Sequence, residues 1–271
     1  MHAIAGALTI AAPMQSFCLA LSHHLQYQSL LHEEIDRVLG DRLPTSQDIP
    51  NMPVLRAFIR ETLRWRPPVP TGIPHESTQD DIFDGYHIPK GSVLHPLEWS
   101  ISRDPTMYPD PDAWNPTRWL DPAFPTYKEP LNQFPTITGY SQFGYGKRTC
   151  QGQKLTEADL FVGIGSIAWL FTINGDQREV GAVERDPGKV HNDASNKSEI
   201  RIVCPPTDAT GQTGCTRSEE QRHDPTMHFS GLLIAKPLPF KFELRIRSRT
   251  RAQKVSEAWL EHFLAGEFEN K

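Results

Sequence analysis

Cys150 lies in the segment Phe143-Gly144-Tyr145-Gly146-Lys147-Arg148-Thr149-Cys150-Gln151-Gly152, just before a run of residues that is predicted to be helical. A thiol at the start of a helix is stabilised as a thiolate by the helix dipole and by backbone N–H groups that lack partners within the helix. Arg148 adds a positive charge, and the glycines allow the backbone to approach a flat ligand closely. A thiolate held in this way can bind iron and donate electron density to it.

A simpler interpretation is that Cys150 is a buried core thiol, as free cysteines often are. The chain has four cysteines in 271 residues, at positions 18, 150, 204 and 215. This number does not indicate a disulfide framework and fits a reducing compartment. A metal site containing Cys204 and Cys215 is a further alternative, but neither residue has the paired neighbour that zinc sites usually show.

The composition limits the classes of function. The net charge of −5 and the pI near 6.1 argue against a nucleic-acid partner. Hydrophobic residues make up 38% of the chain, which is enough for one large domain or two small ones. Residues 183–225 are polar and poor in aromatic side chains, so we predict a disordered insertion there.

Charged residues upstream of Cys150 form a second pattern. Glu61 and Arg64 are three positions apart in a predicted helix, so that their side chains lie on one face. Arg118 follows in the segment Trp114-Asn115-Pro116-Thr117-Arg118-Trp119. If the three side chains meet in a buried site, the planar guanidinium groups can brace the coil that leads to the cysteine loop. This role is structural.

Periodicity predicts the elements that position these residues. Apolar residues at helical spacing predict three helices, and Pro67-Pro68 ends the second of them. Alternation around Asp84-Gly85 predicts a hairpin, and aromatic residues in a proline-rich stretch predict packed coil. The predicted helices are 24–39, 53–65 and 153–173, the hairpin is 82–88, the coil is 104–136 and a late strand lies within 229–247.

These motifs together resemble the cytochrome P450 superfamily. Phe143, Gly146, Arg148, Cys150 and Gly152 match each fixed position of its F-x-x-G-x-R-x-C-x-G signature. The pattern at 61–64 matches its E-x-x-R, and 114–119 resembles its aromatic-x-P-x-R-aromatic element. The resemblance implies a mainly α fold with small β-sheets, here the incomplete C-terminal half. It also implies heme b (iron protoporphyrin IX) as cofactor, with Cys150 as the iron ligand.

The resemblance assigns expectations to residues on the other sides of the haem. His75 falls where the family places a partner for a haem propionate, and Arg148 is expected to contact another. Residues 5–10 resemble the A-G-x-[DE]-T-[TS] stretch of the distal helix, and Thr9 matches the hydroxyl used in proton delivery. Leu8 stands where the family has an acid, and an apolar side chain cannot relay a proton.

The nearly uncharged residues 1–21 have two interpretations. Pattern alone favours a buried helix over a membrane or signal segment, because Pro13 and Gln15 interrupt the apolar run. The resemblance strengthens the buried-helix interpretation for residues 3–21. It also implies an N-terminally truncated chain, because complete family members carry about as much chain again upstream, including a membrane anchor in eukaryotic forms.

The resemblance implies a division of the chain into four parts. We expect a haem-binding half at 1–182, the polar insertion at 183–225, C-terminal strands of the same domain at 226–250 and a tail at 251–271. The resemblance covers residues 3–180 and extends to 229–247. Within that last segment, Ser230-Gly231-Leu232 is expected to be a substrate-facing turn.

The implied function is a haem-thiolate monooxygenase of fungal secondary-metabolism type. Such an enzyme inserts one oxygen atom from dioxygen into a small apolar substrate, with electrons from an NADPH-dependent reductase. One alternative is a non-catalytic remnant without a closed haem pocket, and another is an interaction or membrane-associated protein built on the apolar N-terminus. Family members are often anchored to the endoplasmic reticulum and face the cytoplasm, but the sequence contains no anchor, so its localisation stays open.

Overall fold

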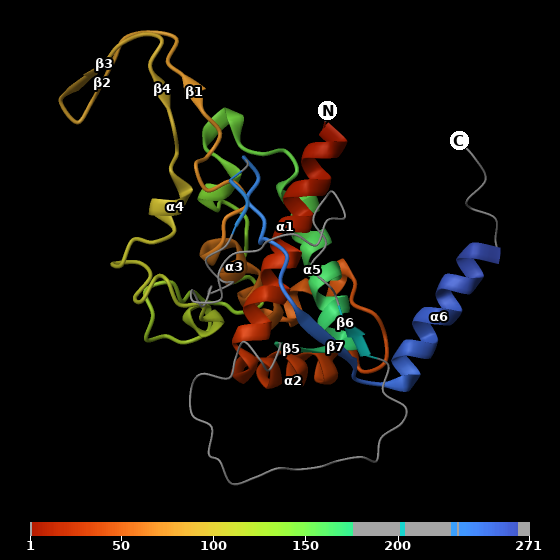
Figure 1. The fold of residues 1–271 in the computed structure, drawn as a ribbon. Coiled ribbons are helices and arrows are strands. Elements are labelled where there is room, and N and C mark those ends of the chain that lie inside the picture. Colours follow the sequence, from red (N-terminus) through yellow and green to blue (C-terminus); the bar gives the residue numbers. More distant parts are fainter. Residues whose placement is uncertain (1, 176–200, 204–228, 232, 265–271) are drawn as a thin grey trace, which may run out of the picture.

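The computed structural model describes residues 2–175, 201–203, 229–231 and 233–264, and it is mainly helical with small antiparallel sheets (Figure 1). This confirms the predicted fold class. The helices of the described ranges are α1 (His2–His23), α2 (Gln28–Leu39), α3 (Pro53–Trp65), α4 (Glu98–Ile101), α5 (Gln153–Leu170) and α6 (Arg249–Leu264). Short 3-10 turns lie at Leu25–Tyr27, Ser46–Asn51, Pro116–Trp119, Ser141–Phe143 and Gly146–Arg148.

The strands form three small sheets within the described residues. Strand β1 (His75–Glu76) pairs with β4 (Val93–Leu94), and β2 (Asp81–Phe83) pairs with β3 (Tyr86–Ile88). The third sheet has the order β5-β7-β6, built from Phe171–Gly175, Phe242–Ile246 and Arg201–Val203. The β2–β3 hairpin turns at Asp84 and Gly85, both with positive φ, as the sequence predicts.

Helix α3 is the centre of the core and has the predicted bounds. Pro53 occupies its first turn, where a missing N–H costs nothing, and the prolines after Arg66 end it. The α3 backbone N–H groups of Val54 and Leu55 donate to the buried Glu34 carboxylate, at 2.9 and 2.8 Å. Burial raises the pKa of Glu34, and these two hydrogen bonds oppose that rise.

Helices α1 and α5 pack side by side over α3 (Figure 1). Gly163 of α5 permits this approach, because a Cβ atom there would overlap the Met14 side chain of α1. The second half of α1 is buried from Ser16 to Ser22, in agreement with the buried-helix interpretation, whereas Ala7 and Leu8 are exposed. Among the described residues, no helix combines the length and the apolar character needed to cross a membrane.

Four predicted elements differ from the structure. The first predicted helix, 24–39, is α-helical only from Gln28, because a 3-10 turn at Leu25–Tyr27 precedes it. The third predicted helix, 153–173, ends at Leu170, because Phe171 and the residues after it pair with β7. Within the predicted late strand only 242–246 is regular strand, and Phe229 forms an isolated bridge with Pro237. Residues 201–203 of the predicted insertion form strand β6, and the other residues of 183–225 lie outside the described part.

The predicted tail, 251–271, begins inside helix α6, which reaches Leu264. Arg251 fastens this helix to the body. Its guanidinium donates to the Asp36 carboxylate at 2.7 Å and to the carbonyl oxygens of Gly40 and Trp169 at 2.8 and 2.9 Å. Charge pairing across more than 200 positions of sequence is not visible in a local pattern, which is why this docking was missed.

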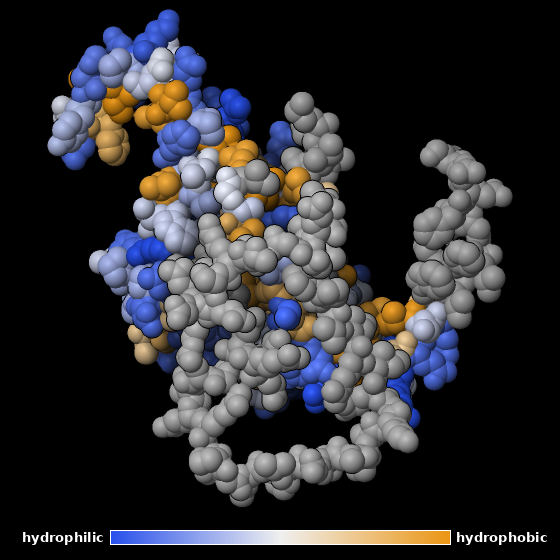
Figure 2. All heavy atoms as spheres, viewed as in Figure 1, coloured by the Kyte–Doolittle hydropathy of each residue, from blue (hydrophilic) through white to orange (hydrophobic). Residues whose placement is uncertain are grey.

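The arm formed by β1 to β4 projects from the body (Figure 1). Ile82 and Phe83 are more than two-thirds exposed at its tip. On the face shown in Figure 2, apolar atoms gather on this arm and at its base. The exposed apolar residues of the arm are Ile82, Phe83, Tyr86, Val93 and Leu94.

Candidate functional site

The loop that carries Cys150 closes on itself immediately before α5. The Cys150 N–H donates to the Phe143 carbonyl oxygen at 2.6 Å, so the two ends of the loop meet. Gly144 and Gly146 have φ values of 80° and 58°, which favour glycine over any residue with a Cβ atom. Cys150 is exposed, and the interpretation of this residue as a buried core thiol is therefore wrong.

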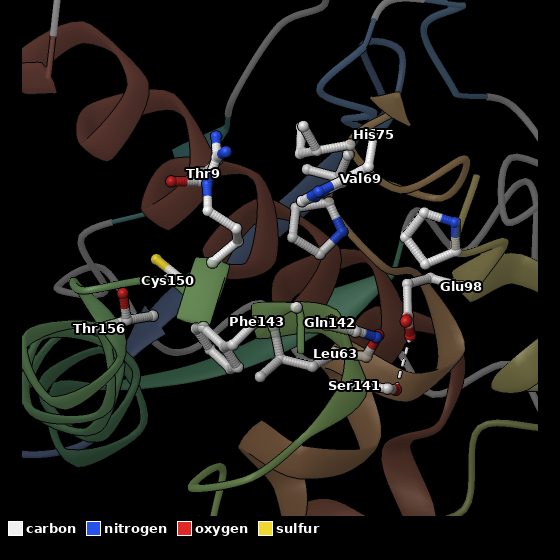
Figure 3. Close-up of a pocket in the computed structure, with 15 residues that line it drawn as sticks. Thr9, Leu63, Val69, His75, Glu98, Ser141, Gln142, Phe143, Cys150 and Thr156 are labelled. Carbon is white, nitrogen blue, oxygen red and sulfur yellow. Dashed lines mark hydrogen bonds between the residues drawn. The ribbon is translucent and has the colours of Figure 1, made fainter. Parts of the chain in front are cut away.

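A cavity of about 330 Å³ lies beside this thiol. Figure 3 shows Thr9, His75 and Cys150, which come from α1, β1 and the loop, around one opening. Of the site residues predicted from the sequence, Gly146 and Gly152 do not line the cavity. The lining residues are Thr9, Leu63, Pro68, Val69, Ile73, His75, Pro96, Glu98, Ser141, Gln142, Phe143, Gly144, Arg148, Cys150 and Thr156.

The chemistry of this lining fits haem. The walls are largely apolar, as a porphyrin face requires, and Arg148 and His75 supply basic groups suited to carboxylate side arms. Within the described residues, no three His, Cys, Asp or Glu side chains come together, so a bare metal ion finds no ligand set there. A porphyrin brings four nitrogen ligands of its own and needs only one more, which the exposed Cys150 can provide.

Thr9 lies on the part of α1 that borders the cavity. Its hydroxyl donates to the Gly6 carbonyl oxygen at 3.2 Å. The neighbouring Leu8 is 48% exposed and does not line the cavity. The hydroxyl expected from the sequence is therefore at the cavity, but the position before it carries no proton-exchanging group.

Glu98 is a cavity residue that the sequence reading missed. Its Oε2 accepts a hydrogen bond from the Ser141 hydroxyl at 2.7 Å, and its buried Oε1 has no partner among the described residues. Burial raises the pKa of Glu98, and the hydrogen bond from Ser141 opposes the rise. A single acid between Leu97 and Trp99 was the available signal.

Glu61, Arg64 and Arg118 meet in the core, and of these contacts helical spacing predicted only that between Glu61 and Arg64. Arg64 donates to both Glu61 oxygens, each at 2.8 Å, and Arg118 Nε donates to Glu61 Oε1 at 3.0 Å. The side chains are 0%, 0% and 1% exposed, respectively. Burial alone would lower the pKa of Arg64, but the Glu61 charge and hydrogen bond raise it above its usual value.

Two further donors complete this cluster. The Trp119 indole N–H donates to Glu61 Oε2 at 3.0 Å, and the Asn115 backbone N–H donates to Oε1 at 2.9 Å. The arginines also reach outward, since Arg64 donates to carbonyl oxygens of Ser102, Pro111 and Ala113. The cluster thereby ties the irregular coil to α3 with buried, charge-assisted hydrogen bonds.

Other residues singled out from the sequence lie elsewhere. Ser230 borders a separate cavity next to Arg66 and Trp99, and it is absent from the lining beside Cys150. Leu232, of the same predicted turn, lies outside the described residues, as do Cys204 and Cys215.

Comparison with known proteins identifies relatives for most of the chain. The sequence model of the family described as Cytochrome P450 matches residues 2–190. The cytochrome P450 monooxygenase psoD of Aspergillus fumigatus is 41% identical over 168 residues, which cover 61% of this chain and 32% of that protein. The cytochrome P450 monooxygenase virE of Hypocrea virens is 32% identical over 255 residues, which cover 94% of this chain and 40% of that protein.

Solved structures agree at the level of the fold. A zebrafish cytochrome P450 determined with abiraterone superposes with a TM-score of 0.60 at 23% identity, covering 90% of this chain and 45% of that one. The chain spans only 32% of the length of psoD and 40% of the length of virE. Since the family match covers well over half of the residues and includes the loop around Cys150, this chain belongs to the cytochrome P450 family.

Proposed function

We propose that this chain is the cysteine-ligand part of a haem-thiolate monooxygenase that inserts one oxygen atom from dioxygen into a small organic substrate. The observation that carries the proposal is the exposed Cys150 thiol beside a largely apolar cavity with basic groups in its lining. Haem is the cofactor of the family, and the fungal relatives are named monooxygenases. The resemblance of the sequence to fungal family members extends the proposal to secondary metabolite biosynthesis.

Several lining residues have a proposed part in holding the cofactor. Cys150 supplies the sulfur ligand, while Arg148 and His75 pair with the propionates. Phe143 provides an apolar surface, and the glycines of the loop leave space for the ring. When bound, the haem supplies dioxygen activation, and electrons come from an NADPH-dependent reductase.

Thr9 is the proposed proton-handling residue on the α1 side of the cavity. Its hydroxyl is both a donor and an acceptor and lies among the lining residues. Leu8 leaves it without an adjacent acid, so we expect electrons to be consumed with little product. In the chain supplied with haem and reductase, Leu8→Asp should raise the product formed per electron, whereas Leu8→Asn should not. Equal yields in both variants would show that the missing acid at position 8 does not limit product formation.

The cavity lining also supports the class of substrate. Val69 and Ile73 present aliphatic surface, and most of the exposed lining is apolar even though Glu98 and Arg148 also border the cavity. A small apolar substrate gains from burial against such walls.

A haem titration of the purified chain tests the proposal. We expect the wild-type chain and the loop variant Lys147→Ala to bind one haem each with the same affinity, because Lys147 is exposed and does not line the cavity. Cys150→Ala should lose the thiolate-type absorption spectrum. If the wild-type chain binds no haem, or if Cys150→Ala leaves the spectrum unchanged, the proposal is wrong.

A second candidate is a non-catalytic member of the family. The exposed Leu8 in place of an acid is the observation that favours it. In that case haem uptake is absent, or haem is bound but electrons supplied to it yield no product even in Leu8→Asp.

A further inference from the structure

Helix α3 carries three arginines one turn apart, Arg56, Arg60 and Arg64, and the middle one differs from its neighbours. Arg56 donates to the carbonyl oxygens of Pro135 and Leu131, and Arg64 pairs with Glu61. The Nε and Nη1 atoms of Arg60 are buried and have no hydrogen-bond acceptor among the described residues. A buried charged donor without an acceptor is energetically costly. A ligand that accepts from these two nitrogens would remove that cost.

Aromatic rings satisfy only part of the Arg60 charge. The guanidinium carbon lies 3.3 Å from the centre of the Tyr140 ring and 5.0 Å from that of Trp119. Ring faces attract the cation, but they do not accept hydrogen bonds from N–H groups in the guanidinium plane. Burial lowers the pKa of Arg60, which is the sign of a desolvated charge that its surroundings do not fully compensate.

A cavity of about 130 Å³ adjoins Arg60 on the coil side of α3. Lys128 contributes a second positive charge to its lining, and Thr138 contributes a hydroxyl group. The hydroxyls of Thr126 and Thr136 also line it, but they already donate to the Arg118 carbonyl oxygen and to the Glu157 carboxylate. The volume accommodates a small polyatomic ion rather than a single water, whose share of liquid volume is about 30 Å³. No described residue is shared between this lining and that of the cavity beside Cys150.

Nearby carboxylates do not neutralise Arg60 by direct contact. Glu157 accepts from the Thr136 hydroxyl at 3.0 Å and from the Ile137 N–H at 3.4 Å, and Glu98 is held by Ser141. Glu61 is occupied by the ion-pair cluster. None of these three acids accepts a hydrogen bond from the buried Nε or Nη1 atom of Arg60. The cavity therefore combines two positive charges with the Thr138 hydroxyl group, which is the chemistry of an oxyanion site.

We propose that this cavity binds a small oxyanion, phosphate being the type that suits it best, with Arg60 and Lys128 as its cationic ligands. A guanidinium stacked on a ring keeps its N–H edge available, and that edge matches phosphate or carboxylate oxygens. The bound ion links α3 to the coil segment 126–139, since the cavity is lined from both. Binding to the folded chain alone also stabilises it by mass action.

The test is equilibrium dialysis of the full chain against radiolabelled inorganic phosphate, at an ionic strength fixed with sodium chloride. We expect one saturable site in the wild-type chain and a matching rise in its unfolding midpoint. Arg60→Gln should weaken the affinity by about tenfold or more, and Lys128→Gln by a smaller factor. The control Arg42→Gln removes an exposed arginine elsewhere and should bind as the wild type does.

Several outcomes overturn the proposal: no saturable phosphate site in the wild type, unchanged affinity in Arg60→Gln, or equal displacement of phosphate by added chloride. Displacement of phosphate by acetate, with the same dependence on Lys128, supports a general oxyanion site. If Arg60→Gln does not fold, Lys128→Gln and Thr138→Val carry the test, because both side chains lie on the exposed rim. Unchanged affinity in both variants then contradicts the proposal. Neither result depends on haem binding.

Discussion

The buried cluster around Glu61 and the loop around Cys150 use charge and backbone in opposite ways. Both Glu61 oxygens accept hydrogen bonds from several donors, and the side chains of the cluster are removed from solvent. The loop instead holds glycines at positive φ and an exposed thiol beside a cavity. The buried hydrogen bonds that stabilise this region therefore lie in α3 and its coil, and the loop leaves its sulfur available to a ligand.

Among the variants of the buried cluster, we expect Glu61→Ala to have the largest effect on stability. It leaves Arg64 and Arg118 buried without their carboxylate, and we expect a loss of about 3–5 kcal/mol in the free energy of unfolding. Urea denaturation measures it. Glu33→Ala removes an exposed acid from α2 and should change little. Similar losses in the two variants would show that the cluster does not stabilise the core.

Replacing one guanidinium group of the cluster should lower the free energy of unfolding by a smaller amount. Arg64→Lys keeps the positive charge but loses the paired bonds to Glu61 and most of the bonds to coil carbonyls. We expect destabilisation of about 2 kcal/mol, whereas the exposed Arg37→Lys should be nearly neutral. The same denaturation curves decide this. A neutral Arg64→Lys would mean that charge alone suffices.

We expect His32, on α2, to make the stability of the folded chain depend on pH. Burial, assisted by the Arg247 charge, lowers the pKa of His32 to about 4, from an unfolded value of 6.5. The unfolded chain therefore binds more protons between these values, so stability falls as the pH drops from about 6.5 to about 4. Discounted for partial exposure, the loss is about 1–2 kcal/mol.

The His32 contribution is isolated by subtraction. His32→Gln should flatten this part of the stability profile, while His87→Gln, which removes an exposed histidine, should leave it unchanged. Asp48 has a pKa of about 2 because of Arg42, so its contribution is lost in a lower window, as the pH falls below about 4. An identical slope in wild type and His32→Gln would contradict the prediction.

The smallest expected effect lies in the loop. Gly146 has a φ of 58°, and a Cβ atom there meets no other atom within 4 Å. Gly146→Ala should therefore cost only backbone strain, about 1 kcal/mol. Gly6→Ala, at an equally open position in α1 without positive φ, should be neutral or slightly stabilising. Equal effects in both variants would show that the loop is not held in this conformation.

The sequence predicted those features of the structure that depend on residues close together in the chain. The bounds of α3 follow from prolines at both ends, and the hairpin at Asp84-Gly85 follows from its turn residues. The meeting of Glu61 with Arg64 follows from helical spacing. The proximity of Thr9, His75 and Cys150 to one cavity was expected only from resemblance, because the three are far apart in sequence.

Long-range contacts could not be predicted in this way. The start of β5 at Phe171 depends on a partner strand some 70 residues later, and the docking of α6 depends on Arg251 reaching Asp36. The Trp119 indole and the Asn115 backbone N–H are further donors to Glu61, and no signal in the sequence indicated them beyond their nearness to Arg118. The lack of a hydrogen-bond acceptor for Nε and Nη1 of Arg60 is likewise a tertiary property, because it depends on which side chains surround the guanidinium.

The central claim, that Cys150 ligates the haem iron through its sulfur, is tested most directly by optical spectroscopy of the haem-loaded, reduced chain under carbon monoxide. We predict the red-shifted band that a thiolate ligand produces in the wild-type chain, and its replacement in Cys150→His by the band of an imidazole-ligated haem. A wild-type spectrum without the thiolate band, or one that Cys150→His leaves unaltered, would contradict the account.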